Sequence, residues 1–185
     1  LRMMSMAEQN VKDSFDAVQD GTTRLLRTVT EREEYIDFLN KEISKYISGV
    51  LAKETNPQTS RQISVLFKVC GNLERIGDHA MNICEYTRLM EEKGISFSQA
   101  AREEIRSMQK ISLEAMENMK AIGESAGKDN GEIERMEQKI DDMTEQYRAN
   151  QMNRLHGGQC SDEACVLYSE MLTDFERIGD HILNI

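Results

Sequence analysis

Apolar residues recur at helical spacing along almost the whole chain, and the interruptions between the periodic segments are short. Short connections are typical of antiparallel neighbours in a helix bundle, so we expect an all-α fold. The pattern predicts six helices, over residues 2–27, 29–54, 60–92, 97–123, 131–155 and 162–185.

Capping residues support five of the predicted helix starts, because an oxygen-bearing side chain at the N-cap satisfies backbone N–H groups of the first turn. These residues are Thr28 with Glu31, Thr59 or Ser60, Ser96 with Gln99, Asp129 with Glu132, and Ser161.

The chain contains an internal repeat. Residues 72–83 read Asn-Leu-Glu-Arg-Ile-Gly-Asp-His-Ala-Met-Asn-Ile, and residues 174–185 read Asp-Phe-Glu-Arg-Ile-Gly-Asp-His-Ile-Leu-Asn-Ile. A fainter repeat relates residues 33–37 to residues 137–141 at nearly the same offset. Matched offsets on consecutive helices indicate a duplicated three-helix unit. We therefore predict two pseudo-symmetric antiparallel three-helix bundles, with residues 1–94 as the first repeat and 95–185 as the second.

Each repeat carries oxygen-bearing side chains four residues apart on its third helix. A step of four residues turns an α-helix by about 400°, so such residues share one face and drift by about 40° per step. The second helix of each repeat adds another acidic pair at the same spacing. Ionised carboxylates so close together repel each other, so a cation is expected to compensate them. The candidate metal ligands are Glu33, Asp37, Glu74, Asp78 and Asn82, and Glu137, Asp141, Glu176, Asp180 and Asn184.

Two other interpretations of these residues stay open. Acidic residues at helical spacing usually form solvated faces, and Arg75 and Arg177 offer salt-bridge partners. Glu33 could instead complete a capping box that begins at Thr30. The matched position of the acidic pairs in both repeats favours the cation site.

The repeated motif also contains a glycine and a histidine. Gly77 and Gly179 lie inside helices, where glycine costs about 1 kcal/mol relative to alanine, and they indicate either close helix packing, which we favour, or room for an ion. His79 and His181 point about 100° away from the acidic face, so we interpret them as supporting or surface groups rather than ligands.

The composition narrows the class of protein further. Aromatic residues make up 5% of the chain, with no Trp and one proline, which argues against a β-sandwich or barrel. A net charge of −10 argues against direct binding to nucleic acid or to an anionic membrane surface. The four cysteines lack a Cys-x-x-Cys pair, so we expect reduced thiols in a cytosolic setting.

No catalytic residues emerge from the sequence, and we do not expect an enzyme. The nearest enzymatic alternative is a ferritin-like carboxylate-bridged metalloenzyme, whose signature is Glu-x-x-His. Here His79 follows Glu74 at five residues, as His181 follows Glu176, so each histidine lies on a different face. The sequence also lacks a nucleophile elbow, a P-loop and a Rossmann glycine pattern.

The doubled Glu-Arg-Ile-Gly-Asp-His-x-x-Asn, on the third helix of each unit, resembles the PhoU family of phosphate-transport regulators. The resemblance extends over essentially the whole chain. It implies a metal cluster on each three-helix bundle, held by the Glu/Asp positions named above. The metals that it implies are iron, zinc, manganese or magnesium.

Members of this family occur in two settings. The chain begins inside an amphipathic stretch at Leu1, so it resembles more closely the cytoplasmic PhoU-like domain of bacterial sodium/phosphate cotransporters. That resemblance implies a non-catalytic regulatory domain, tethered at the cytoplasmic face of the inner membrane by a transporter domain in cis. The alternative is a free-standing phosphate-signalling regulator, which contacts transporter or sensor-kinase components. Association between copies of the chain is a further expectation, and a purely structural helical adaptor without metal is the remaining class.

Overall fold

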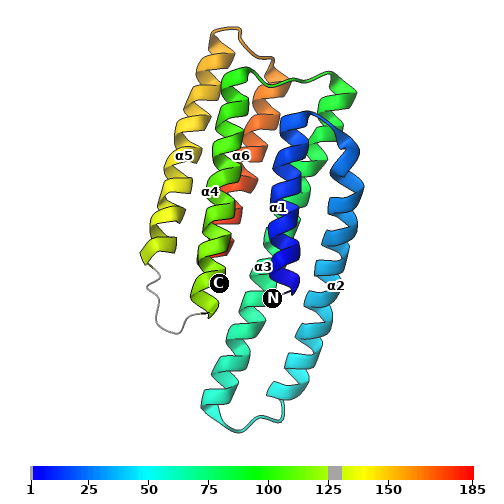
Figure 1. Ribbon diagram of the computed structural model, residues 1–185, viewed down its shortest axis with the longest axis vertical. Helices are drawn as coiled ribbons and strands as arrows, with labels where there is room; N and C mark the ends of the chain where they lie inside the picture. Colours follow the sequence, from blue (N-terminus) through cyan, green and yellow to red (C-terminus); the bar gives the residue numbers. More distant parts are fainter. Residues whose placement is uncertain (1, 125–130) are drawn as a thin grey trace.

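The computed structural model describes residues 2–124 and 131–185, and within these ranges it contains six α-helices and no strand (Figure 1). A short 3₁₀ helix, η1 (Thr23–Leu25), joins the first two α-helices. The all-α prediction is therefore confirmed. The helices are α1 (Arg2–Asp20), α2 (Leu26–Leu51), α3 (Pro57–Lys93), α4 (Gln99–Glu124), α5 (Gly131–His156) and α6 (Asp162–Leu183).

The first helix is shorter than the apolar pattern predicts. α1 ends at Asp20, because Gly21 adopts a left-handed backbone conformation (φ 60°) that favours glycine. After η1, α2 begins at Leu26 instead of residue 29. Thr28 therefore lies inside α2, and the predicted capping box of Thr28 and Glu31 is wrong.

Side-chain caps mark three further helix starts. Asn56 caps α3 and is followed by a proline in the first turn, so this helix begins three residues before the predicted position. Ser98, rather than Ser96, accepts a backbone N–H of α4. Ser161 caps α6 as predicted. The predicted cap Asp129 lies outside the described residues.

The six helices form two three-helix bundles that share one core. α1, α2 and α3 pack together, and so do α4, α5 and α6. The bundles meet where α3 packs against α6 and α1 packs against α4. A continuous cluster of buried apolar residues draws on both halves, with Phe15 and Ile76 from the first and Tyr168 and Phe175 from the second. That each repeat is a separate domain stays a prediction.

The repeated glycines lie where helices cross closely. A Cβ atom at Gly179 would lie 3.0 Å from two side-chain atoms of Ile140, and one at Gly77 would lie 3.2 Å from Ile36. Ile36 and Ile140 are each the residue before the second acid of their repeat. Close packing is thus what the glycines provide, and it brings the acidic faces of α2 and α3, and of α5 and α6, together.

Substituting Gly179 by alanine is expected to destabilise the protein by roughly 1–2 kcal/mol, because Ile140 must move to admit the methyl group. Gly71, also in a helix, is the matched control, since a Cβ there meets no atom within 4 Å. We expect Gly71→Ala to stabilise the protein by about 0.5–1 kcal/mol through helix propensity. Urea unfolding of both variants checks this, and equal shifts in one direction would contradict it.

Candidate metal centres

The first acidic cluster lies between α2 and α3. Glu33 is buried, with 8% of its surface exposed. The pKa of Glu33 is raised to about 7. The largest cause is this burial, followed by the charges of Asp78, Asp37 and Glu74 and a hydrogen bond with Asp78. Burial and the neighbouring Asp78 and Asp37 also raise the pKa of Glu74. Asp37 and Asp78 are therefore close enough to Glu33 and Glu74 to disfavour the ionised forms of these two glutamates.

A lysine already supplies positive charge to this cluster. Lys41 Nζ lies 2.5 Å from Asp37 Oδ2, one helical turn along α2. Its charge opposes the rise in the pKa of Glu74. Lys41 was not among the predicted site residues, although its spacing of four residues from Asp37 is the usual signal for an ion pair within a helix.

The second cluster is more compact. Glu137 and Asp141 on α5 and Asp180 on α6 each offer a carboxylate oxygen, and these oxygens all lie within 4.8 Å of one another. Burial and the neighbouring carboxylates raise the pKa values of Glu137 and Asp141. Arg177 contacts Asp180 at 3.0 Å. The residue that corresponds to Lys41 in this repeat is Glu145, so the lysine of the first cluster has no counterpart at this position of α5.

Three predicted ligands are not among these neighbouring carboxylates. The amide of Asn82 donates to Asp174 of α6 (3.2 Å), and the amide of Asn184 donates to the backbone carbonyl of Asp180 (2.8 Å). Two steps of four residues rotate a helix by about 80°, which turns the third position of each motif away from the carboxylates. Glu176 is not among the three carboxylates that converge on the second cluster. The ligand roles of these three residues stay predictions.

The two motif histidines meet at the contact between α3 and α6. His79 Nδ1 lies 2.8 Å from Asp174 Oδ1, and His181 Nδ1 lies 3.1 Å from Asn72 Oδ1. The imidazole rings stack with centroids 5.5 Å apart. Burial and the neighbouring His79 lower the pKa of His181. The repeat could have revealed this contact, since Asn72 and Asp174 occupy the same motif position.

The donor atoms of the two clusters indicate which class of metal would fit them. Carboxylate oxygens suit Mg²⁺, Mn²⁺ and iron, whereas structural zinc sites favour sulfur and imidazole. The motif histidines contact Asp174 and Asn72 instead of the acidic groups. The residues therefore fit a hard cation better than zinc.

Fold and acidic groups together define a class of all-helical protein with two three-helix repeats, in which each repeat carries carboxylates where its second and third helices cross. This chain belongs to the PhoU family: the family model described as the PhoU domain matches residues 1–87 and 102–185.

Relatives and solved structures agree with the family. The chain is 28% identical over 187 residues to "Phosphate-specific transport system accessory protein PhoU homolog 1" of Thermotoga maritima, covering 100% of this chain and 79% of the relative. The fold is similar to the crystal structure of PhoU from Pseudomonas aeruginosa, with a TM-score of 0.90 at 21% identity and coverage of 100% and 88%. The PhoU structure from Streptococcus pneumoniae gives a TM-score of 0.81 at 17% identity, with coverage of 98% and 85%.

Proposed function

We propose that this chain is a non-catalytic regulator of phosphate uptake that acts beside a transport system on the cytoplasmic side of a bacterial membrane. The name of the T. maritima relative, an accessory protein of phosphate-specific transport, supports the phosphate connection. That relative is named as an accessory protein rather than as a transporter, which supports the free-standing form over the sodium-transporter fusion. In the described part of the chain, no helix has both the length and the apolar character needed to cross a bilayer.

We further propose that the two acidic clusters bind divalent or trivalent hard cations. The observation that carries this proposal is the convergence of Glu137, Asp141 and Asp180 within 4.8 Å. A bound cation would compensate the mutual repulsion of these carboxylates and would brace α5 against α6. In such a role Mn²⁺, Mg²⁺ or iron would stabilise the helix contact through its positive charge and would not catalyse a reaction, which agrees with a regulatory protein.

The metal proposal is tested at two adjacent acids of α5. Asp141 belongs to the second cluster, whereas Asp142 is exposed and lies outside the group of three. In calorimetric titrations with Mn²⁺, Asp141→Asn is expected to weaken binding at least tenfold, and Asp142→Asn to leave it nearly unchanged, although both remove one negative charge. Equal effects of the two substitutions on Mn²⁺ affinity would show that binding depends only on the net charge of the protein.

The regulatory proposal needs a cellular readout. In a bacterium that lacks its own PhoU protein, expression of this chain is expected to restore repression of a phosphate-starvation reporter in phosphate-rich medium. A reporter that stays active in the presence of the folded protein would contradict the proposal. The reading frame upstream of Leu1 separates a free-standing regulator from a transporter fusion.

Lys41 is expected to compete with metal at the first cluster. Because its ammonium group occupies Asp37, Lys41→Gln should raise the affinity of this cluster for Mn²⁺ by roughly two- to five-fold, the range typical of exposed ion pairs. Lys45, one turn further along α2 and without an ion-pair partner among the described residues, provides the control Lys45→Gln. The measurement is Mn²⁺ titration in an Asp141→Asn background, in which binding at the second cluster is expected to be at least tenfold weaker.

A further inference from the structure

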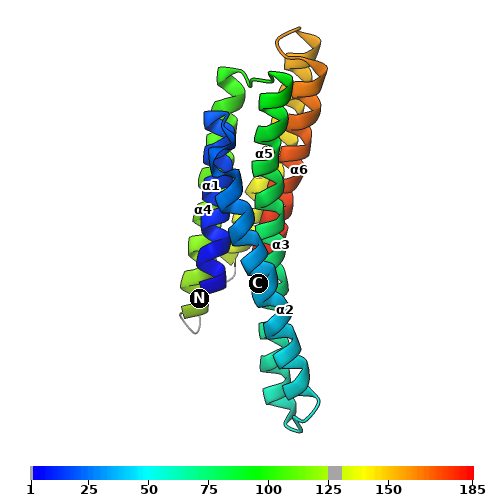
Figure 2. The same ribbon diagram turned by 90° about the vertical axis from the view of Figure 1, so that its right-hand side faces the viewer.

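The hairpin formed by the end of α2 and the start of α3 extends beyond the other helices, at one end of the long axis of the molecule (Figures 1 and 2). We call residues 45–68 the tip hairpin. Four large apolar side chains on it are exposed: Tyr46 (74%), Val65 (56%), Leu66 (57%) and Phe67 (48%). Val65, Leu66 and Phe67 are consecutive, so they cover about 200° of the surface of α3. A contact with one flat protein face would use a narrower stripe.

The tip hairpin is basic, although the protein as a whole is acidic. It contains Lys45, Lys53, Arg61 and Lys68 but only one acidic residue, Glu54, which gives a net charge of +3 and leaves −13 for the rest of the chain. All four basic side chains are exposed. Within the described ranges none of them forms an ion pair, unlike Lys41 or Arg177 in the acidic clusters. The molecule is thus strongly polarised along its length.

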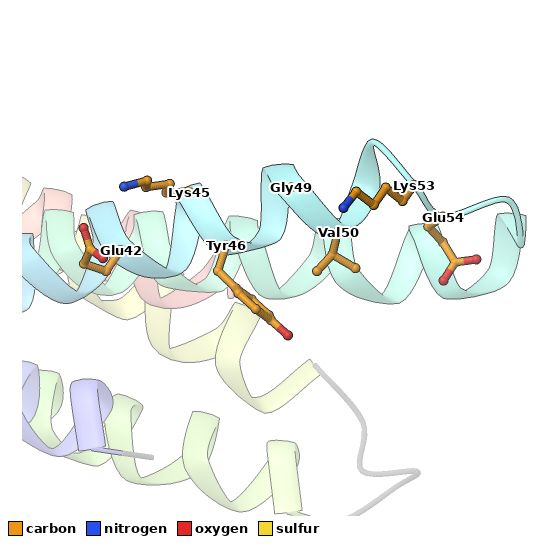
Figure 3. Close-up of a pocket in the computed structure, with 7 residues that line it drawn as sticks. All are labelled: Glu42, Lys45, Tyr46, Gly49, Val50, Lys53 and Glu54. Atoms are coloured by element: carbon orange, nitrogen blue, oxygen red, sulfur yellow. The ribbon is translucent and has the colours of Figure 1, made fainter.

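The basic and apolar groups of the tip lie side by side. A shallow groove on α2 is lined by Glu42, Lys45, Tyr46, Gly49, Val50, Lys53 and Glu54. Figure 3 shows Tyr46 and Val50 directed to one side of the helix, Lys45 directed to the other, and Lys53 extended back along the helix. Tyr46 and Val50 thus lie beside Lys45 and Lys53, and Glu42 and Glu54 line the same groove. Apolar and aromatic groups beside lysines are the arrangement with which a helix enters the interface of a lipid bilayer.

We propose that the tip hairpin binds the surface of a membrane that contains anionic lipid. Lys and Arg gain electrostatic energy near an anionic leaflet, and apolar side chains gain energy by entering the headgroup region. The acidic body of the molecule would be repelled from the same surface, so the protein would stand on its tip. Net charge alone argues against this partner, and only the structure shows that the basic residues gather at one exposed end.

Other occupants fit the tip less well. A symmetric contact between two copies through this hairpin would bring two groups of charge +3 together. Cytoplasmic loops of membrane proteins are themselves rich in Lys and Arg, so they would repel the tip. An anionic lipid headgroup carries the charge that complements the tip.

The absence of Trp from the chain provides a direct test. Phe67→Trp places a unique fluorophore on the tip, and Val166→Trp places one at a position of 62% exposure in the second repeat. On addition of vesicles of phosphatidylcholine and phosphatidylglycerol, we expect the emission of Phe67→Trp to shift to shorter wavelength and that of Val166→Trp to stay unchanged. Vesicles of phosphatidylcholine alone should give a much smaller shift. Equal shifts at the two sites, or equal shifts with both lipids, would overturn the proposal.

Charge reversal completes the test in the same Phe67→Trp background. The double variant Lys53→Glu with Arg61→Glu is expected to lower vesicle affinity about 30-fold or more. The control is Arg24→Glu with Lys93→Glu, which makes the same change of charge at exposed positions outside the tip hairpin. We expect this control to keep most of the vesicle affinity. Circular dichroism confirms that each variant is folded. Similar losses of vesicle affinity in both variants would overturn the proposal. A spectral shift that is independent of lipid and grows with protein concentration would also overturn it, because such a shift would assign the tip hairpin to contact with a second copy of this chain.

Discussion

Replacing Glu104 by glutamine is expected to destabilise the protein by about 3–5 kcal/mol, the usual cost of leaving a buried charge without its partner. Both guanidinium NH₂ groups of Arg154 donate to Glu104, at 3.0 and 2.6 Å, and both side chains are almost buried. Tyr168 Oη also donates to this carboxylate, at 2.5 Å. Burial alone would raise the pKa of Glu104, but the hydrogen bonds from Arg154, Tyr168 and Asn150 outweigh it, so its pKa lies below the usual value.

This effect is measured as a fall of roughly 10 °C in Tm, or by urea unfolding. Glu103, exposed and one residue earlier, provides the control Glu103→Gln, for which we expect a change within about 0.5 kcal/mol. The double variant Glu104→Gln with Arg154→Met should recover much of the loss, because it removes the unpaired charge. Additive effects of the two substitutions would show that the ion pair is not what joins α4, α5 and α6.

The second large effect concerns Glu33 and pH. Its pKa in the folded protein is raised to about 7, so between pH 4.5 and 7 the folded state binds a proton that the unfolded state has already released. Stability is therefore expected to fall as the pH rises through this window, by roughly 2–3 kcal/mol in metal-free protein. Glu33→Gln mimics the protonated form, so it should be more stable than the wild type at pH 8 and similar to it at pH 5.

Urea unfolding in chelator at several pH values tests this prediction, with the exposed neighbour Glu34→Gln as the control. Addition of Mn²⁺ at pH 8 should stabilise the wild type more than Glu33→Gln, because the cation removes the repulsion that the variant lacks. An identical dependence on pH in the wild type and in Glu33→Gln would exclude Glu33 as its source.

Much of the candidate site was predictable because it depends on local geometry. Helical spacing alone placed Glu33 with Asp37 and Glu74 with Asp78 on single faces, and the repeat related them to Glu137, Asp141 and Asp180. The same reasoning placed Asn82 and Asn184 one step further along each helix, and their ligand roles stay predictions.

Contacts between distant residues were not predictable. Asp174 accepts a hydrogen bond from Tyr86 across the two repeats, and Glu104 joins three helices through its contacts with Arg154 and Tyr168. These contacts depend on the rotation of one helix against another, which residue periodicity does not specify.

By itself, the sequence determined the helical class, the duplication and the acidic face of each repeat, since these follow from spacing along one chain. The tertiary structure alone decided which carboxylates converge, because the close crossings at Gly77 and Gly179 set the distance between helices. It also decided where charge gathers. The net charge of −10 is the sum of a basic tip hairpin and an acidic remainder of the chain. Binding depends on how these charges are arranged in space, which the sum does not show.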